Sequence, residues 1–255
     1  GSSEPPSLPT AALRTHGASG ADVTATGGDR PGLADVDEAR RERAIEAAAS
    51  TARWARSVRC GVVVVDPGLL AVFDAARREE EAWRLVAAGK REAAAEFLDP
   101  LRNGRAGTGP GQIERLCRSL HRLAQLEPDV RWCLPTPSGP SGIPGPAELG
   151  WVFDDLGAVR LGYWHVASRA ARWARMVGDD AEAWLDAFGS RAAGVVYDDL
   201  AGADERLLPG TGELDLSRIA GTVPASAVRV LPLPADAGAI AVQAALRYLA
   251  SIGLE

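Results

Sequence analysis

The feature that most constrains this chain is a series of short apolar strands, each followed by a helical segment. The clearest strand is the β-branched run CGVVVVDPG (60–68), which is typical of a parallel strand buried on both faces. Crossovers of a dozen or more residues between such strands predict one parallel sheet with right-handed connections. The other strands are expected at 21–28, 130–137, 159–166, 192–199 and 227–234.

Helical spacing of apolar residues separates these strands. The charged run 77–84 has charges at i and i+4 that can pair along a helix, so we expect it to form a solvated helix face. The glycine-rich stretch 102–111 is expected to break the longest helical region, and a Gly-Asp step is expected to interrupt the segment 168–189. Six strands are fewer than the eight that close a (β/α)₈ barrel. The predicted fold is therefore α/β and TIM-barrel-like, without the first β-α-β portion. The helical segments are 35–57, 69–101, 112–128, 145–157, 168–189, 213–224 and 237–253.

The amino-terminal residues differ in composition from the rest of the chain. Residues 1–20 are rich in Ser, Pro, Thr and Gly, which predicts a flexible arm with at most a short helix around 9–16. Residues 21–255 are expected to form a single domain. Hydrophobic residues make up 46% of the chain and charged residues 24%, which is typical of a globular protein.

Several features point to the cytoplasm. The sequence has no apolar run of about 18 residues, so no transmembrane helix is expected, and no leader of the signal-peptide type is visible. The three cysteines show neither C-x-x-C spacing nor a pairing pattern, so we expect reduced thiols in the core. They are Cys60, Cys117 and Cys133.

The segment 188–224, with LPGTGELD at 208–215, resembles the xylose isomerase-like superfamily of sugar phosphate isomerases, epimerases and endonuclease IV relatives. The strands at 61–68, 130–137 and 159–166 resemble three earlier strands of that family. The resemblance runs from about residue 21 to the end of the chain.

This resemblance implies a divalent metal at the carboxyl ends of the strands, held by carboxylates and histidines. Position by position, little of that metal site is present. Proline stands at the two strand-end Glu positions, and valine stands at an Asp and a His position. Asp198 and Asp204 match acidic or histidine positions, whereas Arg169 and Glu205 replace histidines. The four apolar replacements are Pro135, Val166, Val196 and Pro232.

Proline and valine side chains have no lone pair, so they cannot hold a cation or move a proton. The positive charge of Arg169 would also repel a metal ion. We therefore expect no metal and no cofactor, and a protein of the sugar phosphate isomerase/epimerase type that acts by binding rather than by catalysis. The alternative is an active isomerase or epimerase on a sugar or related polar metabolite, with a site rebuilt around Asp66, His165, Asp198 and Asp204. A homologue with no retained role is a third reading.

The candidate ligand-binding residues lie near strand ends. A structural reading competes with the functional one, because aspartates in such places commonly form turns: Asp66 precedes Pro-Gly, and Asp198 and Asp199 can cap a loop. Alternation along the strand predicts that Trp164 faces inward and His165 faces the helices. The full set of candidates is Asp66, Trp164, His165, Arg169, Asp198, Asp204 and Glu205.

Charge and topology limit the partners. The net charge of −6 argues against nucleic acid, since phosphate neutralisation dominates such binding. A small polar metabolite remains a candidate ligand. An incomplete barrel would also expose two sheet edges, which the N-terminal arm, a partner protein or a second copy should cover. We expect the chain to associate with itself or with a partner protein there.

Overall fold

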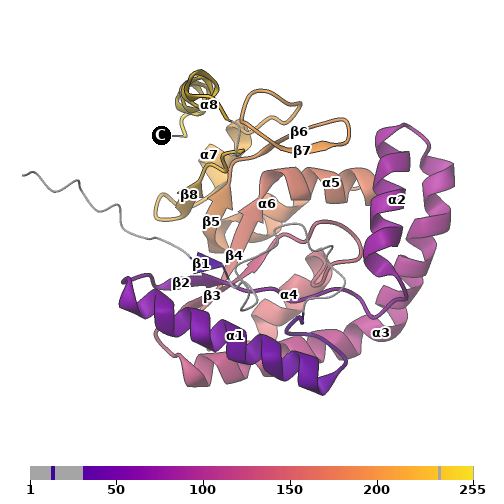
Figure 1. The fold of residues 1–255 in the computed structure, drawn as a ribbon, viewed down its shortest axis with the longest axis vertical. Coiled ribbons are helices and arrows are strands. Elements are labelled where there is room, and N and C mark those ends of the chain that lie inside the picture. Colours follow the sequence, from indigo (N-terminus) through magenta and orange to yellow (C-terminus); the bar gives the residue numbers. More distant parts are fainter. Residues whose placement is uncertain (1–12, 15–30, 235–236, 255) are drawn as a thin grey trace, which may run out of the picture.

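The computed structural model describes residues 13–14, 31–234 and 237–254, and it shows one curved parallel sheet with helices around it (Figure 1). The strand order is β1-β2-β3-β4-β5-β8, so β1 and β8 form the edges of this sheet. The prediction of an incomplete, TIM-barrel-like α/β fold is confirmed. The strands are β1 (Leu13–Arg14), β2 (Val62–Val64), β3 (Arg131–Pro135), β4 (Leu161–Val166), β5 (Ala192–Val196) and β8 (Val228–Val230).

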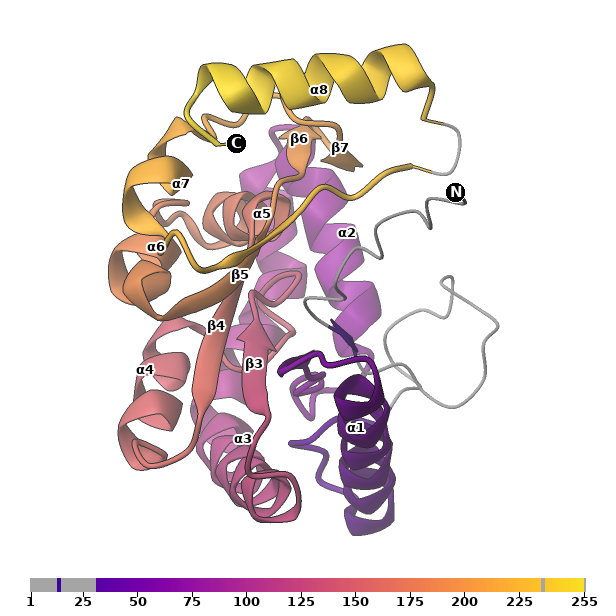
Figure 2. The same cartoon turned by 90° about the vertical axis from the view of Figure 1, so that its left-hand side faces the viewer.

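Helices cover the convex face of the sheet, and the main core lies between them and the strands. Trp132 and Tyr163 project from the sheet into this core, where they join Leu116 and Leu120 of the long helix α3. The last helix, α8, lies across one end of the molecule (Figure 2). The helices are α1 (Glu38–Ser57), α2 (Ala75–Ala87), α3 (Arg91–Leu126), α4 (Pro146–Asp155), α5 (Ala167–Val177), α6 (Ala183–Phe188), α7 (Ser217–Thr222) and α8 (Ala239–Ser251).

Five of the six expected strands contain an observed strand. The sixth expectation, at 21–28, lies outside the described residues. The strand β1 instead comes from Leu13–Arg14, which pairs in parallel with β2. These two residues fall in the segment predicted as an arm with at most a short helix, so that expectation is wrong at this point. The arm and the domain boundary at residue 20 otherwise stay predictions.

The predicted helix break at 102–111 is wrong. Helix α3 continues through this stretch and through Pro100 and Pro110, and the chain breaks earlier, at Gly89, whose φ is +75°. Tertiary contacts explain the difference. A Cβ at Gly104 would lie 2.1 Å from a methyl of Val72, so the glycine allows close packing rather than a turn.

An antiparallel hairpin follows β5, where only a loop is predicted. It consists of β6 (Asp199–Ala201) and β7 (Asp204–Leu207), and it contains an exposed Arg206 with a φ of +61°. The strand predicted to reach residue 199 therefore ends at Val196. The predicted Gly-Asp interruption of 168–189 is confirmed, because α5 ends at Gly178 in the left-handed conformation.

Each of the three cysteines is free and buried, as predicted. In the described part of the chain, no helix combines the length and the apolarity needed to cross a bilayer.

Candidate functional site

The concave face of the sheet, where the resemblance implies metal ligands, is apolar. Trp164 and Val166 of β4 pack there with Val64 of β2 and Cys133 of β3. Burial raises the pKa of the Cys133 thiol to about 12, so this thiol is protonated at neutral pH. We call this surface the concave face. Its other members are Val62, Ala193, Val196, Val228 and Val230.

Trp164 fills the space over the neighbouring strand. The register of β4 against β5 shifts between Tyr163 and Trp164, and Trp164 pairs with Gly194. A Cβ at Gly194 would lie 2.2 Å from the indole ring of Trp164, so the ring lies against a position that only glycine can occupy. The prediction that Trp164 faces inward is confirmed.

The residues present do not fit a divalent metal. Pro135 and Val166 at the ends of β3 and β4 carry no donor atom, and the same holds for Val196 and Pro232. Among residues 13–14, 31–234 and 237–254, no three side chains of His, Cys, Asp or Glu gather closely enough to hold a metal ion. No chemical step through a metal can be derived for this arrangement.

His165 faces the helices, as predicted. Its Nδ1 lies 2.9 Å from the hydroxyl of Tyr163, which in turn lies 2.6 Å from the hydroxyl of Thr136. Burial lowers the pKa of His165 to about 3, so the imidazole is neutral at physiological pH. His165 therefore belongs to a buried hydrogen-bond chain on the opposite side of β4 from Trp164.

Asp198 fixes the start of helix α5. Its carboxylate accepts from the backbone N–H of Ser168 at 2.9 Å and from the hydroxyl of Ser168 at 2.5 Å. Burial raises the pKa of Asp198, while these bonds and the nearby charge of Arg169 act in the opposite direction. The guanidinium of Arg169 donates to the backbone carbonyl of Thr136 at 3.2 Å. Asp198 and Arg169 thus lie near each other where β4 and β5 end.

Asp199 organises the loop that carries the strongest resemblance. Its buried carboxylate accepts from the backbone N–H groups of Leu200, Gly210, Gly212 and Leu214, at distances of 2.8 to 3.0 Å. A carboxylate with four backbone donors is satisfied within the protein. The expectation that Asp198 and Asp199 cap the loop is confirmed for Asp199, whereas Asp198 binds Ser168 at the start of α5 instead.

The remaining candidates are dispersed. The exposed Asp66 accepts from the backbone N–H of Gly68 at 3.0 Å, which is the turn predicted for it. Two strands separate the end of β2, where Asp66 lies, from the end of β5, where Asp198 lies. Asp204 is exposed on the hairpin. The structure therefore does not bring Asp66, His165, Asp198 and Asp204 together.

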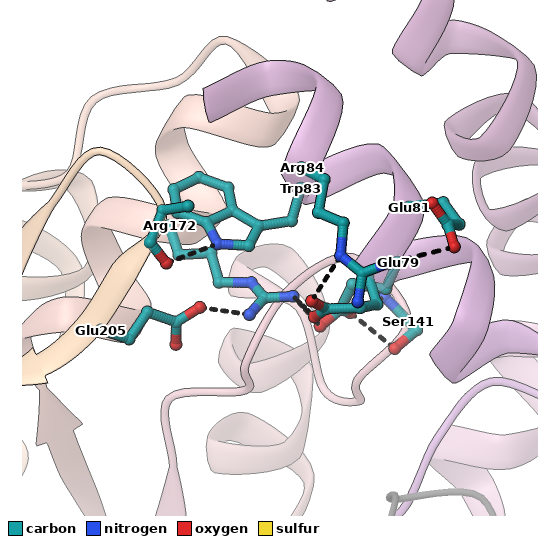
Figure 3. Close-up of polar contacts among 9 residues, drawn as sticks. Glu79, Glu81, Trp83, Arg84, Ser141, Arg172 and Glu205 are labelled. Atoms are coloured by element: carbon teal, nitrogen blue, oxygen red, sulfur yellow. Dashed lines mark hydrogen bonds and ion pairs between the residues drawn. The ribbon is translucent and has the colours of Figure 1, made fainter. Parts of the chain in front are cut away.

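Glu205 instead joins a buried ionic cluster between α2, α5 and the hairpin (Figure 3). Arg172 of α5 pairs with Glu205 and with Glu79, whose carboxylate also accepts from the hydroxyl of Ser141 at 2.6 Å. The guanidinium lies 5.2 Å from the ring centre of Trp83. This cluster fixes the hairpin against α2.

Sequence reasoning missed this cluster. The charged run 77–84 is predicted to be a solvated helix face, yet Glu79 is only 4% exposed and Trp83 only 2%. That expectation is wrong for these two residues, which point toward Arg172. The signal available in the sequence was Trp83 itself, because a large aromatic residue in a charged run indicates a buried side.

An open parallel sheet with helices on its convex face defines an incomplete barrel of the TIM type. No family model matches the sequence, and no curated protein matches it. The fold is nevertheless that of known proteins.

Three solved structures illustrate the likeness. The 3-keto-D-glucoside 4-epimerase YcjR from E. coli has a TM-score of 0.64 at 16% identity, over 96% of this chain and 80% of that one. The D-psicose 3-epimerase from Clostridium cellulolyticum has a TM-score of 0.59 at 11% identity, over 89% and 75%. Endonuclease IV from Thermus thermophilus has a TM-score of 0.56 at 17% identity, over 88% and 72%.

These proteins are xylose isomerase-like TIM barrels, so the resemblance seen in the sequence is confirmed for the fold. At these identities the likeness concerns the fold alone, because one such fold supports many activities.

Proposed function

We propose that this chain is a non-catalytic binding protein built on a sugar-epimerase type of barrel. One observation carries the proposal: Trp164 lies against Gly194 on an apolar concave face, where the resemblance implies the metal and its ligands. Burying a cation or a polar substrate against valine and tryptophan side chains would cost several kcal/mol without compensating bonds.

The strand-end polar groups support the same conclusion. Asp198 is bonded to Ser168, His165 is bonded to Tyr163, and Glu205 is paired with Arg172. A general acid or base must be able to reach the proton that it moves. These groups are already engaged in bonds that hold the fold, which disfavours the alternative of an isomerase with a rebuilt site.

Metal dependence provides the test. The full chain would be purified, its metal content would be measured, and its melting temperature would be followed in Mn²⁺, Zn²⁺ and Mg²⁺ against EDTA. We expect no bound metal and no stabilisation at stoichiometric concentration, since a ligand that binds the native state raises its stability. D-fructose would be incubated with the protein and followed by NMR, and we expect no epimerisation. Stoichiometric stabilisation by one cation, or turnover of the sugar, would refute the proposal.

Partners of two kinds agree with this function: a small polar metabolite, or a protein chain that pairs with the edge strands β1 and β8. An acidic chain is a poor match for nucleic acid, which is not part of the proposal. Light scattering at micromolar concentration tests self-association, because pairing through the sheet edges requires a dimer or larger species. Binding of a metabolite or of a different protein leaves the purified chain monomeric.

A further inference from the structure

We propose that two copies of this chain associate by inserting Phe73 of each copy into a cavity on the other. The cavity lies beyond the carboxyl end of β2, between the loop 31–37 before α1 and the loop 65–74 before α2. We call it the β2 cavity. Phe73 belongs to the second loop. The inference goes beyond the proposed function, because such an association does not depend on whether the chain is catalytic.

Phe73 is the most exposed large hydrophobic side chain in the described part of the chain, at 85%. It does not line the β2 cavity, but its neighbours Val72 and Asp74 do. The phenyl ring therefore stands at the rim and leaves the cavity of its own copy open. Single exposed hydrophobic residues are common on protein surfaces. What distinguishes Phe73 is its place directly beside a cavity.

The two loops around the cavity are joined through their backbones. The N–H of Ala34 donates to the carbonyl of Pro67 at 2.9 Å. A Cβ at Gly32 would lie 2.5 Å from the Cα of Gly68, so the loops approach each other at a point that requires glycine. The walls of the cavity therefore hold a fixed separation.

Buried and helical side chains fix the second loop from below. Gln112 of α3 is 1% exposed, and its amide accepts from the N–H of Ala71 at 2.8 Å and donates to the carbonyl of Leu69 at 3.0 Å. Nε of Arg78 donates to the carbonyl of Phe73 at 3.0 Å. The cavity and the backbone of Phe73 are thus in place before association, which lowers its entropic cost.

The charged side chains of the walls are already paired. Asp35 accepts from Nε of Arg40 at 2.7 Å, and Asp74 pairs with Arg77. A charged ligand would have to compete with these pairs, whereas a phenyl ring needs only apolar contact. The walls supply such contact through Val36, Leu69, Val72 and Ala76.

The volume of the β2 cavity suits an aromatic side chain. The volume is about 400 Å³. An apolar cavity of about 150 Å³ already holds a benzene molecule. The β2 cavity therefore has room for one phenyl ring together with part of the chain that carries it.

A second copy is the partner that supplies a matching ring and a matching cavity at once. In a two-fold dimer the same patch meets itself, so a contact from one copy to the other is always repeated in reverse. Phe73 and the cavity lie side by side, so one two-fold axis between them allows both insertions. The charges agree with this arrangement: Asp74 and Arg77 beside the ring have opposite signs, and each can pair with the other across the axis.

The patch is small for a dimer interface. The walls of the cavity and Phe73 comprise fewer residues than the roughly 20–30 per side of a standard interface. We therefore expect a weak, reversible dimer with a Kd in the micromolar range. An aromatic anchor in a pocket contributes disproportionately to binding, so most of the affinity should depend on Phe73.

Sedimentation equilibrium of the full chain over the micromolar range tests the inference. Phe73→Ala removes the ring, and Ala71→Trp fills the cavity from an exposed position in its wall. Trp54→Ala is the control, because it removes an aromatic side chain that is 57% exposed near the other end of α1. We expect Phe73→Ala and Ala71→Trp each to weaken the dimer at least about tenfold, and Trp54→Ala to leave it unchanged.

A mixture of the two variants gives a sharper test. When Phe73→Ala meets Ala71→Trp, the ring of the second variant can still enter the open cavity of the first. One of the two insertions is then intact, so the mixture should associate more tightly than either variant alone. Thermal melting of each variant checks that it is folded.

A wild type that stays monomeric throughout the micromolar range would overturn the inference. So would a dimer that tolerates Phe73→Ala and Ala71→Trp as well as it tolerates Trp54→Ala, which is the result expected for pairing through the sheet edges. A mixture that associates no better than its separate components would rule out reciprocal insertion.

Discussion

The indole of Trp164 lies across the backbone of Gly194 on the neighbouring strand, so that a Cβ at Gly194 would stand 2.2 Å from Cζ3 and 2.5 Å from Cη2 of the ring. The pair occupies the interior of the half-barrel between β4 and β5. A large aromatic side chain and an obligatory glycine thus lie two residues before Val166 and Val196, at which the family resemblance implies polar ligands. The concave face is consequently a packed surface.

Replacing Gly194 with alanine tests this packing. The added methyl group must displace the Trp164 ring or shift β5, and such overpacking costs about 1–3 kcal/mol. Urea unfolding of Gly194→Ala should therefore show a lower free energy of unfolding. Gly150→Ala on α4 is the control: its Cβ meets nothing within 4 Å, and alanine should stabilise the helix by about 0.5–1 kcal/mol. Similar stabilities for the two variants would contradict the observed contact.

His165 should make stability fall at acidic pH. Burial lowers its pKa to about 3, whereas an unfolded histidine titrates at about 6.5. The neutral imidazole of His165 therefore makes its full contribution to the free energy of unfolding above about pH 6.5. This contribution is lost as the pH falls toward 3, at up to about 1.4 kcal/mol per pH unit. His165→Gln keeps a polar group near Tyr163 but cannot titrate. Denaturant unfolding across this range should show a shallower pH dependence for the variant, and identical slopes would count against a buried neutral imidazole.

Asp198 should make the stability fall as the pH rises, which is the opposite of the effect expected for His165. Its pKa is raised in the folded state, chiefly by burial, so folding favours the protonated carboxyl. Its contribution is complete below the unfolded pKa of about 3.9 and is lost as the pH rises through the folded pKa. The free energy of unfolding of the wild type minus that of Asp198→Asn should therefore decrease from about pH 4 upward. An increase over the same range would show that the bonds from Ser168 outweigh burial.

Arg172 should contribute far more to stability than an exposed arginine in an ion pair. Arg172→Met leaves the buried carboxylate of Glu79 without its cation, and breaking a buried pair in this way costs about 3–5 kcal/mol. Arg118→Met, which removes an exposed pair with Glu114 on α3, should cost about 0.5 kcal/mol or less. Equal losses measured by chemical unfolding would mean that the cluster in Figure 3 is not held as described.

Much of the fold was predictable from local pattern. The run at 60–68 is β-branched and bounded by a turn, and it contains β2. Helical spacing placed α1, α4 and α8 to within a few residues. The hairpin after β5 was not predictable in this way. Its register depends on Asp199, whose carboxylate binds backbone groups up to 15 positions away in the sequence.

The candidate site, too, was predictable only where a local pattern of the sequence decides the structure. His165 and Trp164 were assigned to the correct faces, because alternation along a strand is a local rule. The burial of Glu79 was missed, since its partner Arg172 lies 93 residues further along the chain. The glycines at 102–111 predict a break, yet Gly104 permits the approach of Val72 within a continuous helix.

By itself, the sequence determined the alternation of strands and helices and the absence of donor atoms at Pro135, Val166, Val196 and Pro232, because periodicity and side-chain chemistry belong to each residue where it stands. Only the tertiary structure decided that Trp164 fills the space over Gly194 and that Asp198 and Asp199 bind the backbone. These outcomes depend on contacts between distant segments, and such contacts form only when the chain has folded.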